Sequence, residues 1–248
     1  MAEPIGLALG VAGLAGLFSN VIDCFEYIHI GKTFGGNFQT SLLKLDNAML
    51  RLSRWGEAVG LSGRIYDASA LPSWIKPEEK KLAEKTLGQI LNLFDSAEKE
   101  AAKFKSGKSE QDASLDEYND DNDLDASAKP YHQIMREVSV KRQNRTKLST
   151  KFKFAVYSES HLKGLIDDIT SLTDSLMNLF PGRPELEEKQ KQLCSNEVKE
   201  FTNSLKELAD MIKDNDKVLA IALAEVLKPA VSLLSRALFD LDIQLTSC

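Results

Sequence analysis

The chain has 248 residues, of which 43% are hydrophobic and 27% charged, and these are ordinary values for a globular protein of one large or two small domains. Its net charge of −6 argues against a dedicated nucleic-acid binder, so we expect no nucleic-acid partner. The three scattered cysteines, Cys24, Cys194 and Cys248, are typical of reduced thiols and favour a cytoplasmic protein.

The first thirty residues contain the most unusual stretch of the chain. The eighteen residues from Ile5 to Ile22 carry no charge. As an α-helix they would rise about 27 Å, just short of the hydrocarbon thickness of a bilayer. Nine of them are large apolar residues, which form the candidate membrane-inserting set. They are Ile5, Leu7, Leu9, Val11, Leu14, Leu17, Phe18, Val21 and Ile22.

The balance of free energy for inserting this stretch is small. Its apolar side chains favour insertion by about 3 to 5 kcal/mol, and its glycines and polar residues offset much of that. The acids that follow, Asp23 and Glu26, would each cost about 2.5 to 3.5 kcal/mol at the membrane centre. We therefore interpret Asp23 and Glu26 as a switch that limits insertion, and the segment as conditionally insertable.

Small residues in the same stretch are spaced for close helix packing. Gly6 and Gly10 form a Gly-xxx-Gly pair, and Gly13 and Gly16 add further small positions. The same pattern is typical of a buried core helix, which pattern alone favours over a membrane role. A signal peptide is disfavoured because this region contains Glu3 and no basic residue.

Downstream, apolar residues recur at helical spacing. In the first of these helices Trp55 is predicted to be a core anchor, while most charged residues lie off the apolar face. Pro77 suits the first turn of the next helix. Together the patterns predict a compact all-α bundle. The predicted helices span residues 37–59, 77–105, 128–144, 158–180, 185–213 and 216–245.

Two segments of opposite charge lie between these helices. Residues 106–127 hold eight acids against one lysine, which predicts a solvated, mobile loop. The basic run over 141–153 is compatible with contact to anionic lipid head groups. We favour the alternative, in which it pairs with the acidic loop or is simply solvated.

Motifs that carry chemistry are incomplete. Residues 31–33 read Gly-Lys-Thr, but Glu26 stands where a phosphate-binding loop needs glycine. Asp residues at 121–125 mimic the start of a calcium loop, but Ala126 and His132 replace its glycine and glutamate. We predict no catalytic residue, cofactor or metal site, and no enzyme activity.

Particular residues, concentrated over positions 1–60, carry a resemblance to a known family. The chain resembles the fungal HeLo domain of prion and heterokaryon-incompatibility proteins, and the likeness continues more loosely to about residue 225. The matching segments are Ala2–Pro4, Gly16–Phe18, Asp23–Tyr27, Gly31, Phe34–Gly35, Leu45–Asp46, Arg51–Val59, Leu91–Ala97, the basic run 141–153 and Leu179–Pro181.

The resemblance implies a single domain over 1–248 with about seven to nine helices, at most one tiny two-stranded β element, and a homodimer. It also implies a cell-death module that is cytoplasmic at rest. On activation, the membrane-prone helix over 1–30 would leave the bundle, insert in membrane lipid and permeabilise it.

The end of the chain departs from the family pattern. It closes with an apolar helical pattern over 216–248 and has no polar tail with two pseudo-repeats, so we expect no prion-forming domain. Activation would then need a separate partner, either an amyloid-tailed or a receptor-type protein. The alternative is a non-toxic helical interaction or scaffold protein of the same fold.

Overall fold

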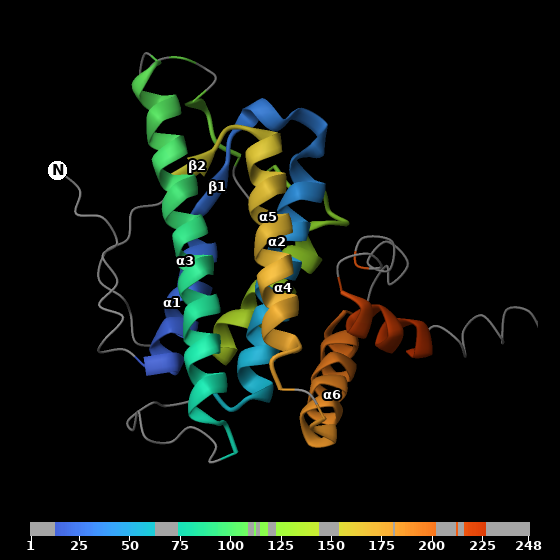
Figure 1. The fold of residues 1–248 in the computed structure, drawn as a ribbon. Helices are drawn as coiled ribbons and strands as arrows, with labels where there is room; N and C mark the ends of the chain where they lie inside the picture. Colours follow the sequence, from blue (N-terminus) through green and yellow to red (C-terminus); the bar gives the residue numbers. More distant parts are fainter. Residues whose placement is uncertain are drawn as a thin grey trace, which may run out of the picture.

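The computed structural model describes residues 13–62, 74–108, 112, 115–118, 123–143, 154–180, 182–201, 212 and 216–226 (Figure 1). The named elements are α1 (Gly13–Glu26), β1 (Ile28–Ile30), the 3-10 helix η1 (Lys32–Asn37), α2 (Phe38–Ala58), α3 (Pro77–Ser106), α4 (Lys129–Arg142), β2 (Phe154–Val156), α5 (Glu159–Met177) and α6 (Pro184–Glu200). A further helix spans 217–226, and the remainder of the predicted C-terminal helix and tail lies outside the described residues.

The all-α bundle and its very short β element are confirmed. The two strands pair in parallel, with Ile28 opposite Phe154 and Ile30 opposite Val156. The prediction of one helix over residues 1–30 is wrong at its end, because α1 stops at Glu26. Ile28 and Ile30 are β-branched residues whose side chains are buried on one side of the strand, a pattern that favours extended backbone.

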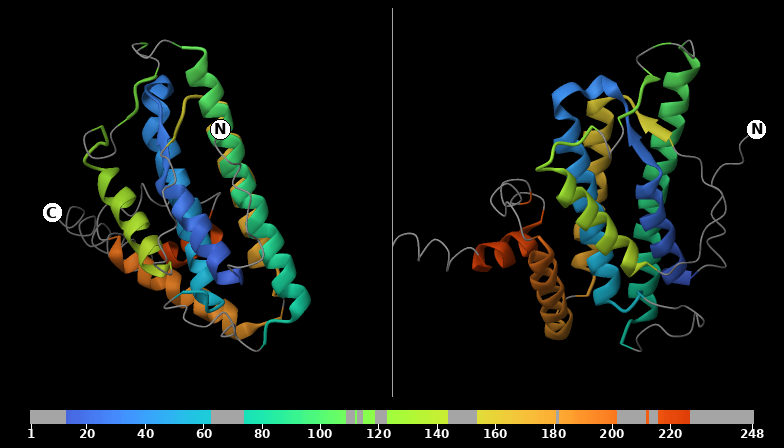
Figure 2. Two further views of the ribbon diagram at one scale, coloured as in Figure 1. Left: turned by 90° about the vertical axis from the view of Figure 1, so that its left-hand side faces the viewer. Right: turned by 180° about the vertical axis from the view of Figure 1, so that it is seen from behind.

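Helix α2 lies at the centre of the bundle. It contacts α1, α4, α5 and α6, and Figure 2 shows α3 and α4 at opposite sides with α1 and α2 between them. Its predicted apolar face packs into the main core, where Trp55 is fully buried. Its charged residues were predicted to lie off the apolar face, and three of them, Asp46, Arg51 and Arg54, are buried as well.

These buried charges are compensated by partners from other helices. Arg54 donates from Nε to both carboxylate oxygens of Glu197 at 3.0 Å, and from its Nη atoms to Asp216 at 3.1 and 3.0 Å. Burial by itself lowers the pKa of Arg54, but Asp216 and Glu197 hold that pKa well above its usual value. We call the connected set the arginine cluster: Arg51, Arg54, Glu57, Arg142, Asp174, Glu197 and Asp216.

The arginine cluster also corrects the interpretation of the basic run. Arg142, at the end of α4, is buried and pairs with Glu57 and Glu197, so its partners are not in the acidic loop. Residues 144–153, which hold the rest of the run, lie outside the described residues.

The described parts of the acidic segment are partly packed, which differs from the expected solvated loop. Tyr118 stacks on Phe38 with ring centroids 3.8 Å apart, and Leu124 is buried. Glu117 forms an antiparallel bridge with Gly31. The few apolar residues of this segment therefore attach it to the bundle despite its charge.

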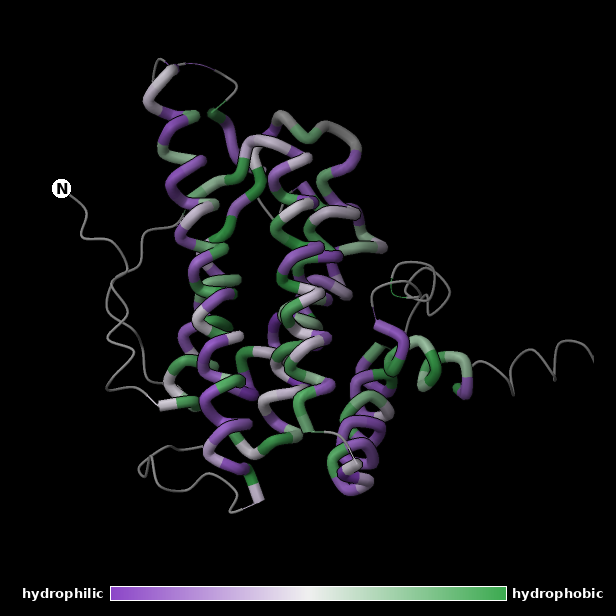
Figure 3. Tube along the Cα trace, viewed as in Figure 1, coloured by the Kyte–Doolittle hydropathy of each residue, from purple (hydrophilic) through white to green (hydrophobic). Residues whose placement is uncertain are grey.

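A second apolar cluster joins the C-terminal part to the back of α2 and α4. Residues 217–226 are mostly hydrophobic (Figure 3), and their buried side chains pack beside the arginine cluster. Burial raises the pKa of the Cys194 thiol to about 12, and the nearby Arg54 does not offset that effect. The second cluster comprises Leu50, Tyr131, Met135, Cys194, Val198, Phe201, Ile212, Leu219 and Leu223.

We expect Arg54→Met to lower the free energy of unfolding by about 3 to 5 kcal/mol, because Glu197 and Asp216 would stay buried with only Arg142 and Arg51 left to compensate their charges. Urea unfolding measures this loss. The control is Lys141→Met, which removes an exposed pair with Glu137 and should change stability by less than about 1 kcal/mol. Equal effects of the two substitutions would contradict a stabilising role for the cluster.

We expect Cys194 to make the fold sensitive to alkali. Its raised native pKa means that only the unfolded thiol ionises between about pH 8.5 and about 12, so stability is constant below this window and falls within it. At pH 10 the loss should reach about 1 to 2 kcal/mol. Urea denaturation at pH 7 and pH 10 measures this loss of stability. In the Cys194→Ala variant the difference in unfolding free energy between the two pH values should be correspondingly smaller.

Candidate functional site

The candidate site is helix α1, because it contains the described half of the predicted membrane-inserting set. The side chains of that half expose 2% or less of their surface and form one wall of the main core. They are Leu14, Leu17, Phe18, Val21 and Ile22. The other members, Ile5, Leu7, Leu9 and Val11, lie outside the described residues, as do Gly6 and Gly10.

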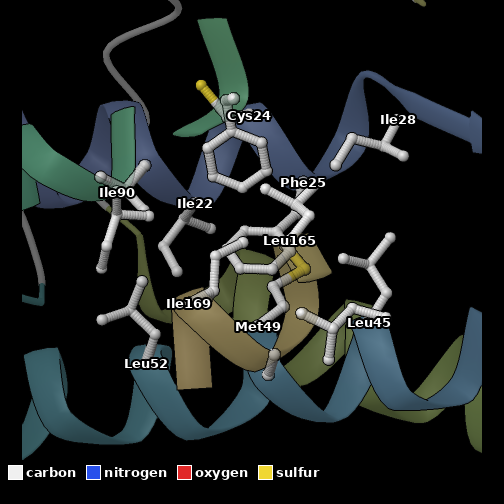
Figure 4. Close-up of a cluster of buried hydrophobic side chains, with 14 of the residues drawn as sticks. Ile22, Cys24, Phe25, Ile28, Leu45, Met49, Leu52, Ile90, Leu165 and Ile169 are labelled. Atoms are coloured by element: carbon white, nitrogen blue, oxygen red, sulfur yellow. The ribbon is translucent and has the colours of Figure 1, made fainter. Parts of the chain in front are cut away.

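The apolar side of α1 packs against two neighbouring helices and the core behind them. Figure 4 shows Ile22 and Phe25 pointing into a space that is also filled from α2, α3 and α5. Phe25 meets Phe94 of α3 edge to face, with ring centroids 5.0 Å apart and planes at 74°. Other positions of α1 are less covered: Ala15, which packs at the edge of the main core, and Asn20 are half-buried, and Glu26 is exposed.

The packing of Phe18 depends on a glycine in α2. The Phe18 ring lies edge-on to Trp55, with centroids 6.4 Å apart, and passes directly over Gly56. A Cβ atom at position 56 would lie 2.3 Å from two carbons of that ring, well inside van der Waals contact. Trp55 and Gly56 together therefore form the surface against which Phe18, in the middle of α1, packs; we call it the Trp55 seat. Trp55 was predicted to be a core anchor, and the structure adds Gly56 as the residue that makes room for the Phe18 ring.

The carboxyl end of α1 is continuous with β1, which is held on both sides. On one side the Phe154 amide donates to the Tyr27 carbonyl, and on the other the Tyr118 amide donates to the Ile30 carbonyl at 2.8 Å. Gly31 lies against the Tyr157 ring, where a Cβ atom would be 2.3 Å away. These contacts tether the helix at the end farthest from the N-terminus.

The two acids of the predicted switch differ in environment. Asp23 is buried, whereas Glu26 is exposed at the last position of the helix. Burial, followed by the negative charges of Asp23 and Glu26, raises the pKa of the neighbouring Tyr27. Both acids thus lie at the carboxyl end of the apolar set, within one helical turn of each other.

The predicted packing glycines are only partly described. Gly13 begins α1 with a φ of +60°, a left-handed conformation that glycine adopts without strain. Gly16 is half-buried within the helix. In the described part of the chain, no helix is both long and apolar enough to span a bilayer.

The energy of this packing determines how α1 could leave. Burying a large apolar side chain is worth about 1.5 to 3 kcal/mol, so the five described members of the set and Phe25 together amount to about 9 to 18 kcal/mol. A whole domain is usually stable by only about 5 to 15 kcal/mol. Release of α1 into water would therefore cost as much as unfolding the bundle, unless another apolar medium receives it.

Sequence reasoning missed the arginine cluster as the second special feature of the fold. The available signal was two arginines, Arg51 and Arg54, and Glu57 within one helix whose apolar face was already assigned. No group of metal-binding side chains occurs among the residues that the structure describes.

Comparisons with known proteins place these features in a family context. Residues 6–211 match the HeLo family model, described as prion-inhibition and propagation. Heterokaryon incompatibility protein S of Podospora anserina is 32% identical over 227 residues, which cover 91% of this chain and 75% of that protein. Heterokaryon incompatibility protein s of the same species is 34% identical over 181 residues, and the match spans 73% of this chain and 61% of that protein.

Solved structures agree with these matches. The HET-S N-terminal domain has 31% sequence identity and a TM-score of 0.80, covering 92% of this chain and 100% of that one. A mutant HET-s N-terminal domain has 29% identity and a TM-score of 0.74, covering 86% and 98%.

We expect Gly56→Ala to destabilise the protein by about 1 to 3 kcal/mol, because its Cβ atom would overlap the Phe18 ring. An alanine in a helix normally stabilises by about 0.5 to 1 kcal/mol, so the sign of the effect is diagnostic. The matched control is Gly164→Ala in α5, where a Cβ atom would meet nothing within 4 Å and stability should rise. Urea unfolding distinguishes the two variants.

The buried Cys24 thiol provides a local measurement of the same effect. In a protein whose other two cysteines are replaced by serine, Gly56→Ala should speed the modification of Cys24 by a thiol reagent. Phe18→Leu should then cost less in the Gly56→Ala background than in the parent, because the smaller leucine side chain also relieves the overlap with the alanine Cβ atom. Additive costs would show that Gly56 and Phe18 do not interact.

Proposed function

Because this chain belongs to the HeLo family, we propose that it is a cell-death effector of the prion-inhibition and heterokaryon-incompatibility type. In this proposal α1 and the residues before it leave the bundle, insert in a membrane and permeabilise it. The observation that carries the proposal is the storage of a hydrocarbon-compatible set of side chains in the core, at 2% exposure or less. Membrane lipid is the partner, and no catalysis is involved.

The energetics support a triggered step. Side chains that leave the core lose about 9 to 18 kcal/mol in water, but most of this loss is recovered if they enter hydrocarbon instead. The resting bundle therefore opposes release until its packing loosens near a bilayer. Asp23 and Glu26 would lie at the end of the inserted segment, where the cost of a carboxylate is lower than at the centre.

The fold offers a route by which loosening could reach α1 from the C-terminal side. Glu197 of α6 and Asp216 hold Arg54, which is adjacent in sequence to the Trp55 seat of Phe18. Withdrawal of either acid would leave Arg54 with one of its two buried partners, and withdrawal of both would leave it uncompensated at a cost of several kcal/mol. We propose that an activating protein acts through this connection. The amyloid-tailed or receptor-type nature of that protein, and the homodimer, stay predictions.

The structure also decides which substitutions can test insertion. Deleting residues 1–22, or placing lysine at Leu14, would remove or charge the centre of the core and unfold the resting protein. Ala15 is better suited because it is only half-buried, at the edge of the main core. Ala15→Lys and Ala15→Leu both add a long side chain at this position, and they differ in charge.

We expect the purified protein to release dye from liposomes when it is destabilised by mild heat or by fusion to a prion-forming tail. Relative to Ala15→Leu, Ala15→Lys should favour the inserted state less by about 3 to 4 kcal/mol, so leakage should fall by about two to three orders of magnitude. Circular dichroism and urea unfolding establish that both variants fold alike. Equal leakage from the lysine and leucine variants would refute insertion through α1.

The scaffold alternative has a distinct outcome in the same assay. A tail-fused protein that aggregates normally but leaves liposomes and cells intact would favour a non-toxic interaction protein of this fold. The relative leakage of the two Ala15 variants would then be undefined, so the two outcomes cannot be confused.

A further inference from the structure

A groove of about 550 Å³ lies between the carboxyl half of α3 and the amino half of α5, away from α1. It exists because the facing side chains are small, with Ala97 and Ala101 on α3 and Gly164 on α5. Elsewhere the same two helices are joined by large residues such as Phe94 and Ile169. The volume is within the range of small-molecule sites, about 300 to 1,000 Å³.

The space at Gly164 is open. A Cβ atom built there would meet nothing within 4 Å, although the residue lines the groove. The walls are predominantly apolar, with Leu93, Val156 and Leu165 contributing side chains. The groove is thus shaped to receive an apolar chain.

One end of the groove is closed by two stacked aromatic rings. Phe104 and Tyr157 are nearly parallel, with centroids 4.9 Å apart. The hydroxyl of Tyr157 donates to the Leu115 carbonyl at 3.1 Å, which fixes this ring. Lys108 and Lys105 each hold an ammonium group over one of the rings, at 5.5 and 5.7 Å. The rings at this end of the groove already have two lysine ammonium groups over them. They form an apolar wall against which the end of a ligand's hydrocarbon chain could pack.

Asp168 lies at the other end. The groove as a whole is lined by two carboxylates, Glu100 and Asp168, against Lys103 and His161. Glu100 is already engaged with Lys103 at 2.6 Å. Asp168 is exposed and forms no ion pair within the described part of the chain. A positively charged group near Asp168 would balance the lining, whereas an anion would be repelled.

From these features we propose that the groove binds a single-chain amphiphile with an ammonium head group. The apolar chain lies along Ala97, Ala101 and Gly164 toward the aromatic wall, and the head group lies beside Asp168. The proposal concerns a different face from α1 and does not depend on membrane insertion.

The test uses three probes that share one chain length and differ in head charge: decylamine, decanol and decanoate. Each is titrated below its micelle-forming concentration into the ¹⁵N-labelled full-length protein. Decylamine should bind saturably at one site and shift the amide resonances of Gly164, Ala101 and Val156. Decanol should bind more weakly, and decanoate weakest of all.

Two variants give the structural readout. Gly164→Leu should fill the groove and weaken decylamine binding by about tenfold or more, while Ser175→Leu, an exposed change about three turns further along α5, should not. Asp168→Asn should reduce the preference for decylamine over decanol by about two- to fivefold, the scale of an exposed ion pair. Because Asp168 is exposed, this second variant remains informative if Gly164→Leu fails to fold.

Several outcomes would overturn the proposal. Shifts that map outside the groove, or equal affinity of the Gly164→Leu and parent proteins, would exclude this site. Tighter binding of decanoate would refute the charge argument. A change in sedimentation of Gly164→Leu without amphiphile binding by the parent would make a second copy of the chain the occupant instead.

Discussion

Burial of α2 on two sides is the constraint on which the rest of this structure depends. One side carries leucines, Met49 and Trp55 into the main core, and the other carries arginines toward α4, α6 and Asp216. A helix buried all round can keep charges only if each meets a partner, since an unpaired buried ion costs several kcal/mol. Other helices must therefore deliver acids to fixed points along α2.

This arrangement makes the two halves of the bundle interdependent. The main core contains α1, and the second apolar cluster contains the C-terminal part, yet both are built on the same helix. Arg54 and Trp55 are consecutive residues that serve the two sides. A disturbance of the acids around Arg54 is thus one peptide bond away from the residue against which Phe18 packs. The proposed triggering of α1 from the C-terminal side follows from this adjacency.

The apolar side chains of α1 are suited to two environments, the protein core and hydrocarbon. In the resting fold it removes large side chains from water, and the same side chains are compatible with hydrocarbon. In the proposed function, the tether through β1 would restrain the carboxyl end of α1 while the helix leaves the bundle. The close approach of the Phe18 ring to Gly56 strengthens the packing of α1 in the resting fold. Because Gly56 belongs to α2, this contact adds no polar residue to α1 that would oppose the proposed insertion. Residues of α2 therefore influence how tightly α1 packs, whereas the residues of α1 itself determine its compatibility with hydrocarbon.

Local patterns in the sequence were sufficient for most helix positions. Pro77 and the apolar stripe behind it predicted a helix over 77–105, and α3 spans Pro77–Ser106. The family and the bundle also followed from residues alone. The short strand β1 did not, because three residues carry too little periodicity, and their pairing with β2 joins positions more than 120 residues apart.

What the sequence determined by itself was therefore the set of helices and the apolar face of each, since helical periodicity is local. Tertiary structure alone decided that the charged side of α2 is buried, that Arg142 turns inward, and that Gly56 supports Phe18. Each of these depends on which distant segment meets which side chain. A pattern along one helix reveals that a face is apolar, but a polar face looks the same in sequence whether water or an acid from another helix will satisfy it.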